Sequence, residues 1–276
     1  MALTSYPLVT VTPGAANTKG AYTTLVASTP YDSSRLYLEL DFSTSQAVRF
    51  LLVDVATGAA GAETVIVANI ATAIDADNLT GEIVPLSVDV PAGTRLALRA
   101  QSVSGTLTGL AVGLLLEDRA LASLANPVTY GADTANSRGT QIDPGTTVNT
   151  KGAYTQFTAS TATRIDALVI CTTTAAQGTA VPSGGMRWRI DVATGGAGAE
   201  TVILPNLQVI ANATEDKARP AIVVFPVAIP AGTRLAVRCD SSINTATIRL
   251  ACVTLIGLQE PAASSGGSAA AVAYVG

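Results

Sequence analysis

Apolar and polar residues alternate in short segments along the whole chain. The clearest segment is 35–42, in which Leu36, Leu38 and Leu40 are separated by other residues such as Glu39. A period of two places successive side chains on opposite faces of a β-strand, so this segment is predicted to be a half-buried strand. The first half of the chain contains eight expected strands, divided by Gly, Pro, Thr and Asn: 8–11, 22–27, 35–42, 47–55, 63–69, 83–90, 94–101 and 106–116.

Three blocks of the first half recur in the same order in the second half. Block 17–23 returns at 149–155, 54–66 at 191–203, and 91–99 at 230–238, with at most one change in each. This period is far longer than the ~20–50 residues of a solenoid repeat, so each copy is large enough to be a domain with its own core. The second copy again contains expected strands, at 154–159, 164–171, 186–192, 200–210, 221–229, 233–240 and 245–257.

Many short strands with Gly- and Pro-rich turns favour an antiparallel β-sandwich, and a jelly roll in particular. The main alternative is an immunoglobulin-type sandwich, which often has a core Trp and a Cys pair that the first copy lacks. We therefore predict an all-β chain of two tandem homologous antiparallel sandwich domains. The expected organisation is a first domain at 1–117, a linker at 118–143, a second domain at 144–259 and a Gly/Ser/Ala-rich tail at 260–276. Helix signals are weak, and the best short candidates are 117–125 and 69–78.

The two copies differ in one loop and in their cysteines. Segment 172–185 stands where the first copy has only 43–46, and its small polar residues predict a surface loop. Cys171, Cys239 and Cys252 all lie in expected strands of the second copy. Without CxxC spacing or any histidine they do not form a zinc site, so we interpret them as small buried residues. Their odd number argues against a disulfide framework and fits synthesis in the cytoplasm.

Composition limits the classes of partner. Charged residues make up 13% of the 276 residues, about half the usual ~25%, and we expect partner subunits to cover much of this weakly charged surface. No apolar stretch reaches the ~20 residues of a membrane-spanning helix, and the start of the chain lacks the features of a signal peptide. Lysine occurs only at 19, 151 and 217 and the net charge is −4, so we expect no binding to nucleic acid.

The third repeated block carries the most suggestive polar pattern. Segment 90–93 suits a type I turn, after which Leu96 and Leu98 are expected to face the core and to leave Arg95 and Arg99 on the opposite face. Two interpretations remain open for these arginines: an arginine–carboxylate ladder on an exposed face, or a subunit contact, where arginine is enriched. With the first block, the candidate interface residues are Arg95, Arg99, Arg234, Arg238, Lys19, Lys151, Tyr22 and Tyr154.

The first repeated block predicts a turn followed by a strand. Gly20 is expected to permit an unusual backbone angle, and Asn17 and Lys19 are expected to fix the turn while Tyr22 packs against the sandwich. A carbohydrate-binding platform built on Tyr22 or Tyr154 is the alternative. Aromatic residues make up only 4% of the chain, which leaves few rings on which a sugar can stack.

The repeated acidic residues bracket a glycine-rich loop. Asp54 and Glu63 in the first copy, with Asp191 and Glu200 in the second, are expected to meet near its base and to face the matched arginines. Calcium binding and glycoside hydrolysis are the alternatives for these carboxylates. A hydrolase triad lacks its usual base because the chain has no histidine, and the loop lacks the GK[ST] of a phosphate cradle. We predict no catalytic, cofactor-binding or metal-binding residues and no enzymatic activity.

The style of the repeated blocks, Asp-Val-Ala-Thr-Gly-x-Ala-Gly-Ala-Glu-Thr-Val-Ile and Pro-Ala-Gly-Thr-Arg-Leu-Ala-x-Arg, resembles that of virion structural proteins of tailed bacteriophages. The resemblance includes the Ala/Thr/Gly-rich, histidine-free composition and covers both repeats, but not the linker or the tail. It implies a non-enzymatic capsid decoration or cement subunit that assembles as a homo-oligomer, in particular a homotrimer, on a phage particle. The major capsid protein would be its partner and the virion its location, after synthesis in the host cytoplasm. A tail-associated, carbohydrate-binding receptor protein is the alternative.

Overall fold

The protein is built from β-strands and turns. The computed structural model describes residues 3–42, 49–74, 82–103, 110–118, 125–174, 185–211, 222–246 and 248–259, and these ranges contain strands and no helix. Of the two helix candidates, residues 69–74 lie in a strand and Glu117 ends another; the other described parts, at 118 and 125, are not helical. The expected tail and most of the expected 172–185 loop lie outside the described residues.

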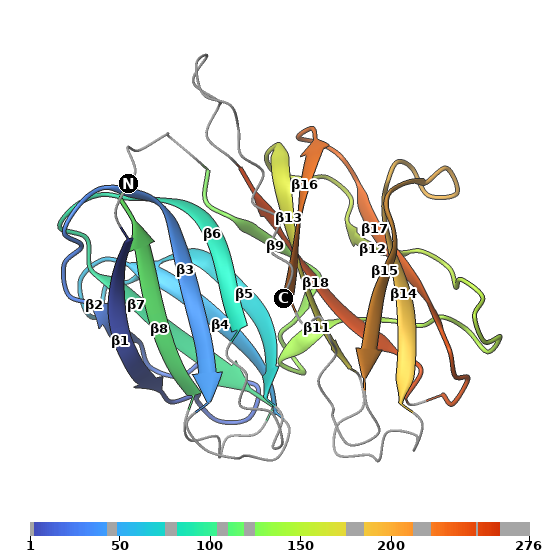
Figure 1. Ribbon diagram of the computed structural model, residues 1–276, viewed down its shortest axis with the longest axis horizontal. Coiled ribbons are helices and arrows are strands. Elements are labelled where there is room, and N and C mark those ends of the chain that lie inside the picture. Colours follow the sequence, from blue (N-terminus) through green and yellow to red (C-terminus); the bar gives the residue numbers. More distant parts are fainter. Residues whose placement is uncertain are drawn as a thin grey trace.

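The first unit is an eight-stranded sandwich (Figure 1). Its strands are β1 (Leu3–Val11), β2 (Thr23–Val26), β3 (Ser33–Phe42), β4 (Arg49–Thr57), β5 (Thr64–Ile74), β6 (Glu82–Val90), β7 (Leu96–Ser102) and β8 (Leu110–Glu117). They form two sheets with the orders β1-β8-β3-β6 and β2-β7-β4-β5. All pairs are antiparallel, and this order of eight strands in two sheets is that of a jelly roll.

The second unit repeats this topology. Its strands are β11 (Arg138–Ile142), β12 (Thr155–Thr158), β13 (Ile165–Thr174), β14 (Met186–Thr194), β15 (Thr201–Ala211), β16 (Ile222–Ile229), β17 (Leu235–Ser241) and β18 (Ala251–Leu258), preceded by the short β9 (Val128–Tyr130) and β10 (Ala132–Asp133). The sheet orders β11-β18-β13-β16 and β12-β17-β14-β15 match those of the first unit strand for strand. The prediction of two tandem jelly-roll-like sandwiches is confirmed.

The segment expected to be a linker, 118–143, contains strands between 128 and 142. This segment contains β9, β10 and β11, and β11 is the counterpart of β1 because each pairs with the last strand of its own unit. The second unit therefore starts well before 144. Sequence reasoning missed β11 because its five residues, Arg-Gly-Thr-Gln-Ile, show no run of alternating apolar positions and lie beside turn-forming residues.

The alternation in β3 builds the first core. Leu36, Leu38 and Leu40 are fully buried between the sheets, as their spacing predicts, whereas Tyr37 and Glu39 on the opposite face are half-buried. The counterpart strand β13 is different, because it is buried on both faces over most of its length. Leu168 and Ile170 belong to the core of the second unit, while Val169 and Cys171 belong to a cluster formed mainly by the first unit.

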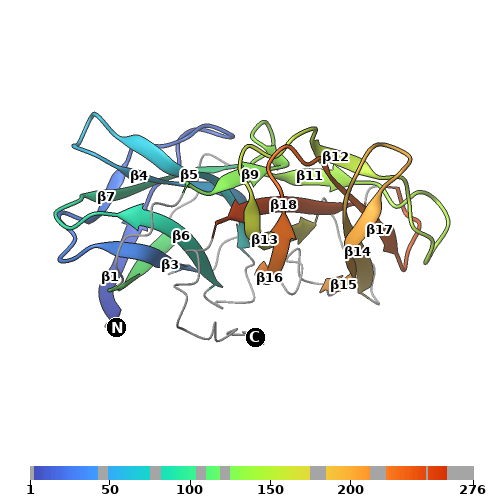
Figure 2. The ribbon, with the colours of Figure 1, turned by 90° about the horizontal axis from the view of Figure 1, so that it is seen from above.

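The two units therefore pack against each other through the outer face of β13 and β18. Figure 2 shows β9 and β13 beside β5 of the first unit, and the hydroxyl of Thr129 donates a hydrogen bond to the carbonyl of Ala68. Comparison of the copies explains the fit. Where β3 carries Arg35, Tyr37 and Glu39, β13 carries Ala167, Val169 and Cys171. Charged and polar positions of the first unit are thus small and apolar in the second.

The three cysteines are buried and free, as the sequence interpretation expected. Burial raises the pKa of each thiol, of Cys171, Cys239 and Cys252 alike, to about 12. The thiols are therefore protonated at neutral pH and serve as small packing groups.

We predict that exchanging one matched pair of residues between the copies has opposite consequences. Cys171→Glu places a carboxylate at a position that is 1% exposed, near Glu82, and should lower the free energy of unfolding by about 3–5 kcal/mol because the charge is left uncompensated. The reciprocal control, Glu39→Cys on the half-buried face of β3, should change it by no more than about 0.5 kcal/mol. Urea unfolding of both variants measures the difference. Equal effects would contradict the packing of the two units described above.

Candidate functional site

The repeated polar residues of the first unit meet on the outer face of its sheet β2-β7-β4-β5. Asp54 on β4 lies directly opposite Arg99 on β7, and Arg99 Nε donates to Asp54 Oδ2 at 2.9 Å. Lys19, from the turn between β1 and β2, places its Nζ 2.7 Å from the other oxygen, Asp54 Oδ1. The backbone N–H of Asn69 on β5 donates to that same oxygen at 2.9 Å. One buried carboxylate thus binds three segments of the unit together.

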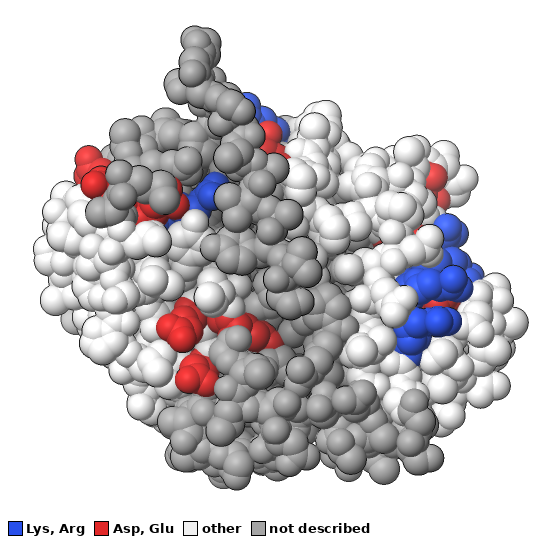
Figure 3. Space-filling model, in the orientation of Figure 1, with Lys and Arg blue, Asp and Glu red and all other residues white. Residues whose placement is uncertain are grey.

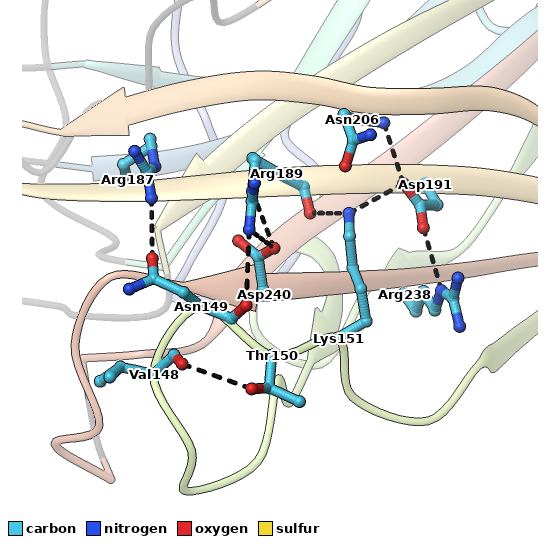
Figure 4. Close-up of polar contacts among 10 residues, drawn as sticks. All are labelled: Val148, Asn149, Thr150, Lys151, Arg187, Arg189, Asp191, Asn206, Arg238 and Asp240. Atoms are coloured by element: carbon cyan, nitrogen blue, oxygen red, sulfur yellow. Dashed lines mark hydrogen bonds and ion pairs between the residues drawn. The ribbon is translucent and has the colours of Figure 1, made fainter.

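The second unit contains the same arrangement around Asp191 (Figure 4). Lys151 Nζ donates to Asp191 Oδ1 at 2.8 Å, Arg238 Nε donates to Oδ2 at 3.0 Å, and the Asn206 N–H donates to Oδ1 at 2.9 Å. Lys151 also donates to the carbonyl of Arg189 at 2.7 Å. We call these two groups, each with its aspartate, lysine, arginine and asparagine, the Asp54 cluster and the Asp191 cluster.

A β-bulge aims one N–H of each cluster at the carboxylate. The pairing of β4 with β5 shifts between Val53 and Val55, which leaves an extra residue in β5, and β15 has the same shift opposite β14. Asn69 and Asn206 adopt positive φ values of 56° and 54° there, a conformation that asparagine tolerates better than most residues. Sequence reasoning missed both asparagines, although the matched Asn in otherwise dissimilar segments was a signal.

The turn that carries the lysine is fixed differently from the sequence expectation. Asn17 and Asn149 have the positive φ, at 55° and 57°, whereas Gly20 does not. Glycine is needed at 20 because a Cβ there would lie 2.3 Å from the carbonyl oxygen of Thr12. Gly152 is confined in the same way, with a Cβ position 2.5 Å from the carbonyl oxygen of Asp143. Close approach of two backbones, and not an unusual angle, explains this repeated glycine.

A second repeated ion pair closes the glycine-rich loop. Arg95 Nη1 donates to Glu63 Oε1 at 3.1 Å and to the carbonyl of Gly58 at 2.9 Å. In the second unit Arg234 makes the equivalent bonds to Glu200 at 3.1 Å and to Gly195 at 3.0 Å. The turn before Arg95 spans 91–94, one residue later than expected, with Thr94 N–H donating to the Pro91 carbonyl. Gly93 has a φ of +78° at its third position, which suits a type II turn instead of the expected type I.

The structure thus brings all eight candidate interface residues into two equivalent groups. The arginines face away from the core as expected, and each contacts a carboxylate of its own unit. The guanidinium of Arg99 lies 4.7 Å from the ring centre of Tyr22, and that of Arg238 lies 4.5 Å from the ring centre of Tyr154, within the range of a cation–π contact. The arginine–carboxylate ladder is confirmed. Each tyrosine has one ring face covered by a guanidinium, which disfavours the carbohydrate platform.

The surroundings of Asp191 favour its ionised form. Burial raises the pKa of Asp191, but hydrogen bonds from Lys151, Asn206 and Arg238 outweigh it, so the pKa lies below the ordinary 3.8. Such a carboxylate stays charged at neutral pH and already has cationic partners on both oxygens, which suits neither proton transfer nor calcium ligation. Over the described ranges no three His, Cys, Asp or Glu side chains gather as a metal site would require. The same ranges contain no helix that is long and apolar enough to span a membrane.

Comparison with known proteins shows likeness of fold only. No family model and no curated protein matches the sequence. A structure of PNGF-II is 8% identical, with a TM-score of 0.39 over 92% of this chain and 65% of that chain, so this chain spans just under two thirds of it. The CBM22-1–CBM22-2 tandem domain of Paenibacillus barcinonensis Xyn10C is 12% identical, with a TM-score of 0.27 over 92% and 87%. The infectious bursal disease virus VP2 subviral particle is 10% identical, with a TM-score of 0.24 over 93% and 71%. At these values the likeness carries no argument about function.

We predict that removing the central carboxylate destabilises the second unit. Asp191→Ala leaves Lys151 and Arg238 without their shared counter-charge and the Asn206 N–H without its acceptor, which should cost about 3–5 kcal/mol of unfolding free energy. The matched control is Asp166→Ala, which removes the exposed pair with Arg164 at 2.9 Å and should cost no more than about 1 kcal/mol. Denaturant unfolding of both variants measures the difference. A loss of less than about 1 kcal/mol in Asp191→Ala would show that the cluster is not structural.

We also predict acid sensitivity that depends on Asp191. Its pKa in the folded protein is lowered from 3.8, so its stabilising contribution is fully present above about pH 5 and is lost as the pH falls through 3.8 and below. Asp191→Asn cannot gain a proton there and should show a shallower decline of unfolding free energy over this range. Unfolding midpoints measured across an acid pH series test this, and parallel curves for the two proteins would contradict it.

Proposed function

We propose that this chain is a non-enzymatic structural subunit of a virion, namely a capsid decoration or cement protein of a tailed bacteriophage. In this proposal it is made in the host cytoplasm, assembles as a homo-oligomer, in particular a homotrimer, and binds the major capsid protein. The observation that carries the proposal is the use of the repeated polar residues. In both copies they bind one another and stabilise the sandwich.

A duplicated active site would be expected to keep polar groups that point toward a substrate. Here Asp54 and Asp191 are 3% and 4% exposed and have lysine and arginine partners. The two copies have kept the buried ion-pair clusters. They differ on the outer faces of their sheets, where β13 is apolar and β3 is charged. A protein whose copies share a scaffold and differ in their faces is suited to making contacts, and the low charged content of 13% supports extensive contacts.

Binding to capsids tests this proposal directly. We predict that purified protein co-sediments with heads of the phage that encodes it, saturates at a fixed number of copies per head, and is displaced by unlabelled protein. Heads already saturated with the protein are the control for non-specific adsorption. A stable monomer that does not bind heads would overturn the proposal. Binding to host polysaccharide without binding to heads would support the tail-associated receptor protein instead.

A further inference from the structure

The contact between the two units uses two different faces, and each unit has both. The second unit contributes the outer side of its sheet β11-β18-β13-β16, which we call the receiving face. The first unit contributes β5 and the outer side of its sheet β2-β7-β4-β5, which we call the docking face. The same names are used for the matching faces of the other unit, so that β1-β8-β3-β6 carries a receiving face and β12-β17-β14-β15 a docking face. Inside the chain, the docking face of the first unit contacts the receiving face of the second. Among the described residues, the receiving face of the first unit takes part in this contact only through β6, which contacts β16, and the docking face of the second unit contributes none of the main strand contacts between the units.

Hydrogen bonds show how the docking face of the first unit is covered. Gln101 Nε2 on β7 donates to the carbonyl of Thr134 at 2.7 Å and to Ser137 Oγ at 3.0 Å, and Ser137 Oγ donates to Asn17 Oδ1 at 2.7 Å. Thr134 and Ser137 belong to the segment between β10 and β11 of the second unit. On the same face Phe50 and Leu52 are fully buried, as expected for side chains inside an apolar contact.

The docking face of the second unit carries charge at the matched positions. Arg187 and Arg189 on β14 stand where β4 has Phe50 and Leu52, and Asp240 stands where β7 has Gln101. Arg187 Nη2 donates to Asn149 Oδ1 at 2.7 Å. In the first unit the matching oxygen, Asn17 Oδ1, instead accepts its hydrogen bond from Ser137 of the second unit. The Arg189 side chain is 37% exposed although it contacts the buried Asp240.

This face is basic overall. Its five cations, Lys151, Arg187, Arg189, Arg234 and Arg238, exceed its three carboxylates, Asp191, Glu200 and Asp240. Figure 3 shows a concentrated patch of Lys and Arg over the β14 region of the second unit. Beside it Ile210 on β15, directly opposite Arg187, is 43% exposed. The matched residue of the first unit is Ala73, opposite Phe50, and it is 1% exposed.

The receiving face of the first unit has the opposite charge. Register places Glu39, Asp41 and Glu117 on the same outer side as a single cation, Arg35, and Figure 3 shows acidic side chains gathered over the β3 and β6 region. The same side carries exposed apolar residues at its edges. Leu3, opposite Glu117, is 56% exposed, and Ile83, opposite Glu39, is 54% exposed.

We infer that chains associate head to tail, with the basic docking face of the second unit bound to the acidic receiving face of the first unit of another copy. This inference deepens the proposed function and rests on it, because it specifies how subunits contact one another. The contact repeats the arrangement already present inside the chain, with charge complementarity in place of its apolar side chains. Because two different faces meet, such a contact closes into a ring or continues as a row.

Charge reversal on each face tests the inference. Arg187→Glu on the docking face and Glu39→Arg on the receiving face should each weaken self-association about tenfold or more, because each puts like charges opposite one another. Arg164→Glu is the matched control, since it makes the same change at an exposed residue outside the basic patch, and should leave association unchanged. Sedimentation velocity over a range of protein concentrations, at low and high ionic strength, measures association of the full chain.

Mixing the two reversed proteins separates a lost contact from a misfolded protein. In an equimolar mixture the carboxylate introduced by Arg187→Glu on one docking face meets the guanidinium introduced by Glu39→Arg on the other chain's receiving face, so association should return. The double variant carrying both changes should likewise associate by itself. Association through one face alone, or through a third surface, predicts no such recovery.

The inference would be overturned by a wild-type chain that stays monomeric, by reversed variants that associate normally, or by a mixture that does not recover. Binding of an acidic polymer such as heparin by the basic patch, with self-association unaffected by Arg187→Glu, would also overturn it and identify another occupant. Co-sedimentation with phage heads tests the proposed function and is measured in a separate experiment. Normal head binding together with any of these results would refute the head-to-tail contact and leave the proposed function standing.

Discussion

One buried carboxylate in each unit binds a turn, a neighbouring strand and a β-bulge to the strand that carries it. Asp54 and Asp191 each contact a lysine from a turn, an arginine from the neighbouring strand and an N–H from a bulge. A buried charge is tolerated only when such partners surround it, so the turn, the strand and the bulge must all be in place together. This requirement explains why the aspartate, lysine, arginine and asparagine of the cluster recur in both copies.

The two copies share this device but have diverged where they touch. On the receiving face, Glu39 of the first unit corresponds to Cys171 of the second; on the docking face, Leu52 corresponds to Arg189. In both places the residue inside the contact is apolar and its counterpart outside is charged. A single internal contact therefore accounts for substitutions on two different sheets and for one of the cysteines found only in the second copy.

The sequence predicted those features that depend on local pattern or exact repetition. Alternation identified β3, the repeated blocks identified two homologous sandwiches, and strand spacing placed Arg95 and Arg99 opposite the acidic residues. The strand β11 could not be predicted from its own five residues. It is a strand because it pairs with β18, which lies far along the chain. The bulges at Asn69 and Asn206 and the packing of the units also depend on tertiary contacts. Cys171, where the first copy has Glu39, was one visible trace of that packing.

The chain runs on from β8 of the first unit to β9 of the second, and this covalent connection has a physical consequence. It gives the two units a high effective concentration for each other, in the millimolar range for short flexible linkers. The apolar side of β13 therefore meets its partner before it can meet another molecule. In the head-to-tail contact proposed above, separate chains would lack that advantage and would meet by diffusion, in which charged faces steer partners together. The covalent connection thus explains why the contact between the two units is apolar and the outward faces are charged.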